Sequence, residues 1–90
     1  MTKKTQTTSV EITQPAVGEM KPSAIEIYLT REGIKQLIVD LEDLVRQPDS
    51  SSVHLNSATW GGEDLVSTPQ RNTNWSADHL RLFVVDKLKG

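Results

Sequence analysis

Two histidines and two glutamates are the residues of this sequence best suited to metal binding or to acid–base chemistry. His54 and His79 lie in segments that alternate apolar and polar residues, as β-strands do, and Glu11 and Glu26 lie in two further segments of this kind. Two imidazoles and one carboxylate could hold a zinc ion and leave one position open. However, these residues come from separate segments, and no compact ligand spacing such as HExxH is present. We therefore favour ordinary strand histidines and predict no metal site.

Motifs for nucleophilic catalysis are missing. Serine and threonine are plentiful, but none stands in a GxSxG motif, and the chain has no cysteine to supply a thiol, a disulfide or a thiolate ligand. Gly61-Gly62 lacks the lysine and the helix opening of a phosphate-binding loop, so we expect it to form a tight turn with positive φ. We predict that the protein is not an enzyme and binds no cofactor.

One amphipathic helix is the strongest structural signal. It is predicted over Thr30–Gln47, where Thr30 can cap the free amides and Pro48 disfavours helical geometry in the residue before it. Gly33 stands where a capping box would have Glu or Gln. Six apolar residues at spacings of three and four fall within an arc of about 120°, which predicts one core-facing stripe. These residues are Ile34, Leu37, Ile38, Leu41, Leu44 and Val45.

Alternation of apolar and polar residues predicts four strands around this helix. They cover residues 9–13, 23–29, 53–57 and 79–85. The order β-β-α-β-β predicts a small α+β domain over residues 9–86, in which the helix packs on one face of a mostly antiparallel four-stranded sheet. Residues 1–8 are expected to form a disordered tail, and residues 87–90 a C-terminal tail.

A single helix covers only one face of such a sheet, so the other face is expected to be open. This second face could be solvated, could bind a partner through its Tyr, Phe and Arg side chains, or could associate with itself. It would carry Glu11, Glu26, Tyr28, His54, Asn56, Arg81 and Phe83.

The length, composition and net charge of the chain limit the class of protein. Ninety residues with 36% hydrophobic residues make one domain with a modest core, so we expect marginal stability, relieved by dimerisation or by a partner. The net charge of −2, with both signs mixed along the chain, does not suggest a nucleic-acid-binding face. No stretch has the apolar length of a membrane span or of a signal peptide, so we expect a cytoplasmic protein.

The segment Ala58–Asp78 is long for a loop in so small a domain, and loops of this length are often functional. Trp60 is either a plug for the core or an exposed anchor. Glu63 and Asp64 are either solvated or able to contact a basic partner.

The run Val53–Leu65 combines a strand containing His-Leu with a following Trp-Gly-Gly-x-x-Leu. With the preceding strand and helix and the final His-Leu-Arg-Leu-Phe strand, residues 23–85 resemble the immunity protein 32 family of bacterial polymorphic toxin systems. The resemblance implies a small cytoplasmic protein that neutralises a toxin by direct binding.

From this resemblance and the open sheet face we predict a non-enzymatic binding protein whose partner is a cognate toxin protein. The alternative is a small structural or regulatory domain that acts as a homodimer, through the same face or through an exposed strand edge. The expected partner-binding residues are Glu26, Tyr28, His54, Trp60, Glu63, Asp64, Arg81 and Phe83.

Overall fold

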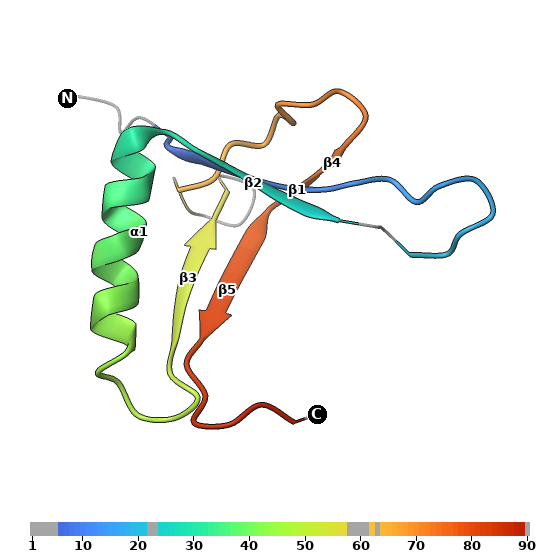
Figure 1. Ribbon diagram of the computed structural model, residues 1–90. Helices are drawn as coiled ribbons and strands as arrows, with labels where there is room; N and C mark the ends of the chain where they lie inside the picture. Colours follow the sequence, from blue (N-terminus) through green and yellow to red (C-terminus); the bar gives the residue numbers. More distant parts are fainter. Residues whose placement is uncertain (1–5, 22–23, 58–61, 63, 90) are drawn as a thin grey trace.

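The computed structural model describes residues 6–21, 24–57, 62 and 64–89. This part of the chain contains five strands and one helix (Figure 1). The elements are β1 (Thr8–Ile12), β2 (Ile25–Leu29), α1 (Arg31–Leu44), β3 (Ser52–Asn56), β4 (Trp75–Ala77) and β5 (His79–Phe83). The predicted α+β class is confirmed. The prediction of four strands in one sheet is wrong, because the described strands form two sheets, in the orders β2-β1-β4 and β3-β5, with antiparallel pairing throughout.

Strand β4 is the element that the sequence analysis missed. It has only three residues, and it pairs with the distant β1 through Ile12 opposite Trp75 and Val10 opposite Ala77. Asp78 separates β4 from β5, and its backbone and side-chain oxygens accept hydrogen bonds from Ser57 N and Ser57 Oγ, each at 2.8 Å. The chain therefore leaves one sheet and enters the other at a single fixed residue, which splits the expected four-stranded sheet.

Leu65 links the two sheets. Its exposed fraction is 0%, and it forms parallel bridges with Thr8 of β1 and with Ser57 after β3. Asp64 N and Leu65 N both donate to Asn56 O, at 3.0 and 3.2 Å. Asp64 and Leu65, at the end of the Trp-Gly-Gly-x-x-Leu run, thus hold the end of β3 against β1.

Gly62 belongs to this closure. A Cβ at Gly62 would lie 2.5 Å from Asn56 O, so the missing side chain lets the returning chain approach the backbone of β3. The predicted tight turn includes Gly61, which lies outside the described residues.

The start of α1 is as predicted. Thr30 Oγ1 accepts a hydrogen bond from Gly33 N at 3.1 Å, and Thr30 N donates to Thr7 O at 2.9 Å. A Cβ at Gly33 would lie 2.7 Å from Thr7 O, which explains why glycine occupies the capping-box position. The helix ends at Leu44, before the predicted end at Gln47.

Part of the predicted N-terminal tail contacts the domain. Residues 1–5 lie outside the described residues. Gln6 Nε2 donates to Leu65 O at 3.0 Å, and Thr8 begins β1. Among the described residues, no helix combines the length and the apolar content needed to cross a membrane.

The core is small. Val10, Leu44 and Leu65 are the buried hydrophobic residues in the described part of the chain. Helix α1 runs alongside β3 and contacts β2 and β3 (Figure 1), so Gly33 and Leu44 are buried. The prediction of one fully core-facing stripe is wrong, because four of its six residues are exposed. Those four are Ile34, Ile38, Leu41 and Val45.

Replacing Gly33 by alanine tests the close contact between α1 and Thr7. Alanine is the better helix former by about 1 kcal/mol, yet its Cβ would lie 2.7 Å from a backbone oxygen. We expect Gly33→Ala to lower the free energy of unfolding by roughly 1–3 kcal/mol, measured by urea unfolding. The exposed Lys35→Ala is the control, with a change within about 0.5 kcal/mol. A Gly33→Ala variant more stable than wild type would contradict the contact.

Candidate functional site

The eight predicted partner-binding residues do not form one site. Trp60 and Glu63 lie outside the described residues. The other six fall in three places. Glu26 and Tyr28 lie on the three-stranded sheet, and His54, Arg81 and Phe83 lie on the antiparallel β3-β5 pair, named the hairpin here although β4 and a long segment separate its two strands. Asp64 lies in the segment after β3 and lines a cavity beside α1.

Glu11 is the most unusual residue of the three-stranded sheet. The sequence places it on an exposed face, but this prediction is wrong: its exposed fraction is 0%. The chain after Leu65 folds back over this face, and the carboxylate accepts four hydrogen bonds. The donors are Ser9 Oγ at 2.7 Å, Gln70 N at 2.6 Å, Arg71 N at 3.3 Å and Asn74 Nδ2 at 2.9 Å.

These hydrogen bonds set the charge of the buried group. Burial raises the pKa of the Glu11 carboxyl, but the bond from Gln70 N, followed by those from Ser9, Asn74 and Arg71, outweighs it. The net result lowers the pKa from 4.5 to about 2. Glu11 is therefore a permanent anion at neutral pH, and it fastens residues 70–74 to β1 through charge-assisted bonds.

Glu26 and Tyr28 belong to the same cluster. Asn74 Nδ2 donates to Glu26 Oε1 at 2.6 Å as well as to Glu11, so one amide nitrogen joins two carboxylates. Tyr28 OH donates to Glu26 Oε1 at 3.1 Å, and Arg71 Nη1 lies 3.6 Å from Glu26 Oε2. The bond from Asn74 leads in lowering the pKa of Glu26, against the effect of burial. Glu26 and Tyr28 thus help to hold the loop, and their role toward a partner stays a prediction.

Asn74 was missed as a structural residue. It is buried, with 5% of its surface exposed, and both its amide hydrogens point to carboxylates. An asparagine in a polar run is typical of any loop, and no local pattern in the sequence says that two strands far away supply its acceptors.

The outer face of the hairpin brings together three of the predicted residues. His54 stands directly opposite Arg81, and Phe83 opposite Ser52, so that these side chains share one side of the two strands. Phe83 is 55% exposed, and His54 and Arg81 are also exposed. This is the surface on which the sequence-predicted aromatic and arginine side chains remain accessible.

The side chains of His54 and His79 lie close together, but Glu11 and Glu26 do not join them. The ring centroids of His54 and His79 lie 5.5 Å apart, and Ser52 Oγ is 2.7 Å from His54 Nε2. Glu11 and Glu26 lie on the other sheet and are bonded to the loop. Within the described residues there is no group of three His, Cys, Asp or Glu side chains that could hold a metal ion.

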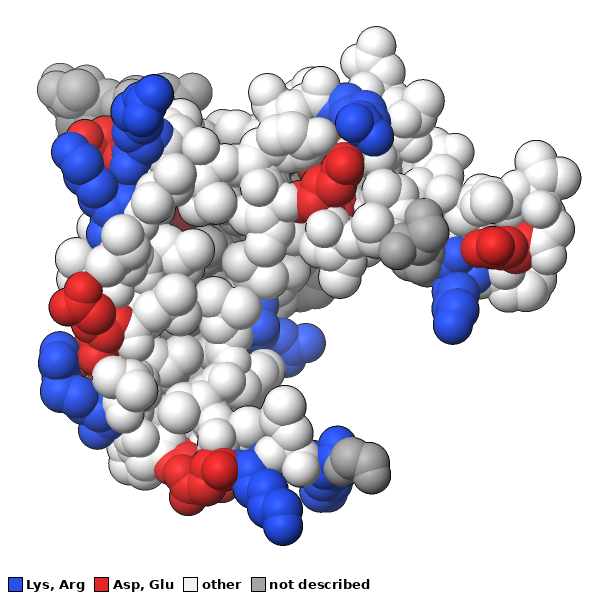
Figure 2. Space-filling view, in the orientation of Figure 1, with Lys and Arg blue, Asp and Glu red and all other residues white. Residues whose placement is uncertain are grey.

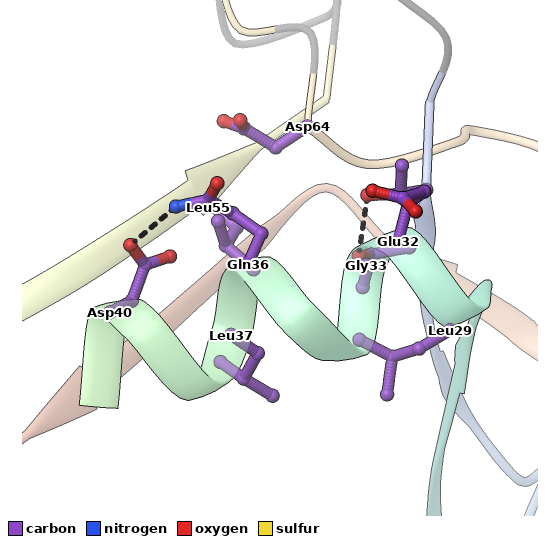
Figure 3. A pocket seen from close by; sticks show the side chains of 10 residues that line it. Leu29, Glu32, Gly33, Gln36, Leu37, Asp40, Leu55 and Asp64 are labelled. Atoms are coloured by element: carbon purple, nitrogen blue, oxygen red, sulfur yellow. Dashed lines mark hydrogen bonds between the residues drawn. The ribbon is translucent and has the colours of Figure 1, made fainter. Parts of the chain in front are cut away.

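Asp64 lines a cavity of about 220 Å³ between α1, β1 and β3 (Figure 3). Glu32 and Asp40 line it from the helix, where Gln36 Nε2 donates to Asp40 Oδ1 at 3.0 Å, while Asp64 lies across the cavity. Asp64 Oδ2 accepts from Asn56 N at 3.2 Å, so this carboxylate also supports β3. The three carboxylates make the cavity more suitable for a cationic group than for an anionic one.

Comparison of the chain with protein-family models, with curated proteins and with solved structures gave no match. The resemblance to the immunity protein 32 family therefore stays a prediction.

The anchor made by Glu11 has a specific pH dependence. Because its pKa in the folded protein is about 2, below the ordinary 4.5, Glu11 adds stability above pH 4.5 and loses that contribution as the pH falls toward 2. We expect the unfolding free energy of wild type to decrease over this interval more steeply than that of Glu11→Gln, measured by urea unfolding at a series of pH values.

At neutral pH Glu11→Gln should be less stable by roughly 1–3 kcal/mol, because an amide places a donor opposite donors. The control is Glu32→Gln, whose parent side chain is 77% exposed, with a change within about 0.5 kcal/mol. Identical pH slopes in wild type and Glu11→Gln would show that the carboxylate does not anchor the loop.

Proposed function

We propose that this chain is a non-enzymatic binding protein that neutralises a cognate toxin protein by covering it, as an immunity protein does. The observation that carries the proposal is the number of large apolar side chains left on the surface. Ten of them on the strands, the helix and the C-terminal segment are 42–72% exposed: Ile25, Ile27, Ile34, Ile38, Val39, Leu41, Val45, Trp75, Phe83 and Val85.

The arrangement of charge supports a protein partner. In Figure 2 charged side chains line the outer margin of α1 and the lower end of the molecule, with further charged groups in the upper part and near the centre, and broad areas between them carry no lysine, arginine, aspartate or glutamate. An apolar centre with a polar rim is the usual layout of a protein–protein interface. Contiguous exposed apolar patches are uncommon on proteins that act alone, and the stripe on α1 is the most compact group among these side chains.

The hairpin face is the surface that we assign to the toxin. Phe83 supplies an exposed aromatic ring, and Arg81 and His54 supply donors beside it. Aromatic and arginine side chains are enriched among the residues that dominate binding energy. If the toxin is basic, the carboxylates of Glu26 and Asp64 would accelerate the encounter more than they would strengthen the complex.

Binding to the product of the neighbouring gene tests this proposal. We expect a one-to-one complex by titration calorimetry, and restored growth when the two proteins are produced together. Phe83→Ala should raise the dissociation constant by about tenfold or more, because it removes an interface ring. The control is Val39→Ala on the outer side of α1, whose parent side chain is similarly exposed (59% against 55%) and whose loss should not change binding.

Two results would count against the proposal in different ways. Absence of both binding and growth rescue would remove the immunity function. Tight binding that is unchanged in Phe83→Ala would keep the function and exclude the hairpin face as the toxin surface.

A further inference from the structure

Four apolar residues of α1 and its C-cap form a stripe that is exposed on the surface of the domain. Ile34, Ile38, Leu41 and Val45 are 45%, 49%, 43% and 72% exposed. At about 100° per residue they lie within an arc of about 60°, next to the side on which Gly33 and Leu44 are buried. The charged side chains seen over α1 in Figure 2 gather along the outer margin of the molecule and leave a white band beside the hairpin.

We propose that this stripe packs against the same stripe of a second copy of the chain, with the two α1 helices antiparallel. The stripe is symmetric about the midpoint between residues 39 and 40. A two-fold axis there places Ile34 opposite Val45 of the second copy, and Ile38 opposite Leu41. Every apolar residue of the stripe then meets another one, as a two-fold interface requires.

The charges beside the stripe match this arrangement. Lys35 and Glu42 lie on the same flank of α1, about 100° and 80° from Ile34. A two-fold axis perpendicular to the helices brings this flank next to its own counterpart. Lys35 then lies about 3 Å along the helix axis from Glu42 of the second copy, within reach of two long side chains. Symmetry makes two such ion pairs in each dimer.

Like charges oppose the arrangement at Arg46. Arg46 lies on the same flank, and Arg46 of the second copy would lie about 3 Å along the helix axis from both Arg31 and Lys35. Arg46 is about 110° from the middle of the stripe, against about 70° for Glu42, and it lies toward the end of the contact, where crossing helices diverge. Glu42 is therefore the nearer partner of Lys35, and their attraction dominates.

The proposed dimer goes beyond toxin binding and uses a different surface. The hairpin face with Phe83 stays free when the α1 helices pair. A dimer can therefore form whether or not a toxin binds, and Phe83→Ala is expected to dimerise like wild type.

Sedimentation equilibrium of the full chain tests the proposal. We expect wild type to follow a monomer–dimer equilibrium. Ile38→Glu should raise the dimer dissociation constant about a hundredfold, because it places a carboxylate at the centre of an apolar contact. The matched control is Val39→Glu, which alters a neighbouring residue that is 59% exposed and about 100° away from the stripe. This variant should dimerise like wild type.

A charge exchange tests the direction of the helices. Lys35→Glu and Glu42→Lys should each raise the dissociation constant about tenfold, since each turns two attractions into repulsions. The double variant Lys35→Glu/Glu42→Lys should return to the wild-type value. A loss of fold cannot produce that recovery, and neither can the contact of Lys35 with Glu32 within one helix, at 3.5 Å, which the double variant does not rebuild.

A wild-type chain that stays monomeric, a dimer that survives Ile38→Glu, or a double variant as weak as the single ones would each overturn the antiparallel helix pair. Because no toxin is present in these experiments, none of these results bears on the neutralising function.

Discussion

The ionised carboxylate of Glu11 holds residues 70–74 against the three-stranded sheet. A buried carboxylate is costly to desolvate, and it is stable here because four donors surround it, two of them backbone amides of the loop. The same charge attracts the amide of Asn74, which in turn bonds Glu26. With the loop fixed on that face, Trp75–Ala77 lies beside β1 and pairs with it as strand β4. Asp78, the next residue, accepts a hydrogen bond from Ser57 at the end of β3, and β5 follows. The anion of Glu11 thus stabilises the arrangement in which the chain passes from one sheet to the other.

Because the polar loop covers one face of the three-stranded sheet, the apolar side chains on the opposite face stay exposed. The loop covers the face of β1 and β2 that carries Glu11 and Glu26, and α1 lies beside β3, so the opposite face of the three-stranded sheet keeps Ile25, Ile27 and Trp75 exposed. Three buried hydrophobic residues among those described give little hydrophobic stabilisation. The domain is therefore one whose stability can rise strongly on association, by RT ln(1 + [L]/Kd) for whatever binds only the folded state.

Sequence reasoning succeeded where a feature depends on neighbouring residues. The N-cap at Thr30, the alternation in β1, β2, β3 and β5, and the α+β class are all local patterns, and the structure has them. It failed where the partner is distant in the chain. Nothing near Glu11 indicates that Gln70 and Asn74 will cover it, and nothing near Trp75 indicates a strand, because three residues are too few to show a period.

The helix stripe was identified correctly as apolar, but periodicity reports the side of a helix and not what covers that side. For the candidate site, the sequence grouped His54, Arg81 and Phe83 correctly on one face. It wrongly placed Glu11, Glu26 and Tyr28 on the same face, because these three lie on the other sheet.

The two proposed contacts fit together because they use different faces and depend on the same marginal core. Gly33 and Leu44 are the buried residues of α1, so the exposed apolar stripe of the helix has the most apolar surface left to bury on association. The hairpin is joined to the other sheet through Leu65, Ser57 and Asp78, so its strands are held in place by contacts that do not involve its outer face. Rigid presentation lowers the entropy lost on binding. If the α1 pair forms first, the stabilised domain presents two hairpin faces related by a two-fold axis, and a toxin binding to one face adds to that stability without competing for the helix.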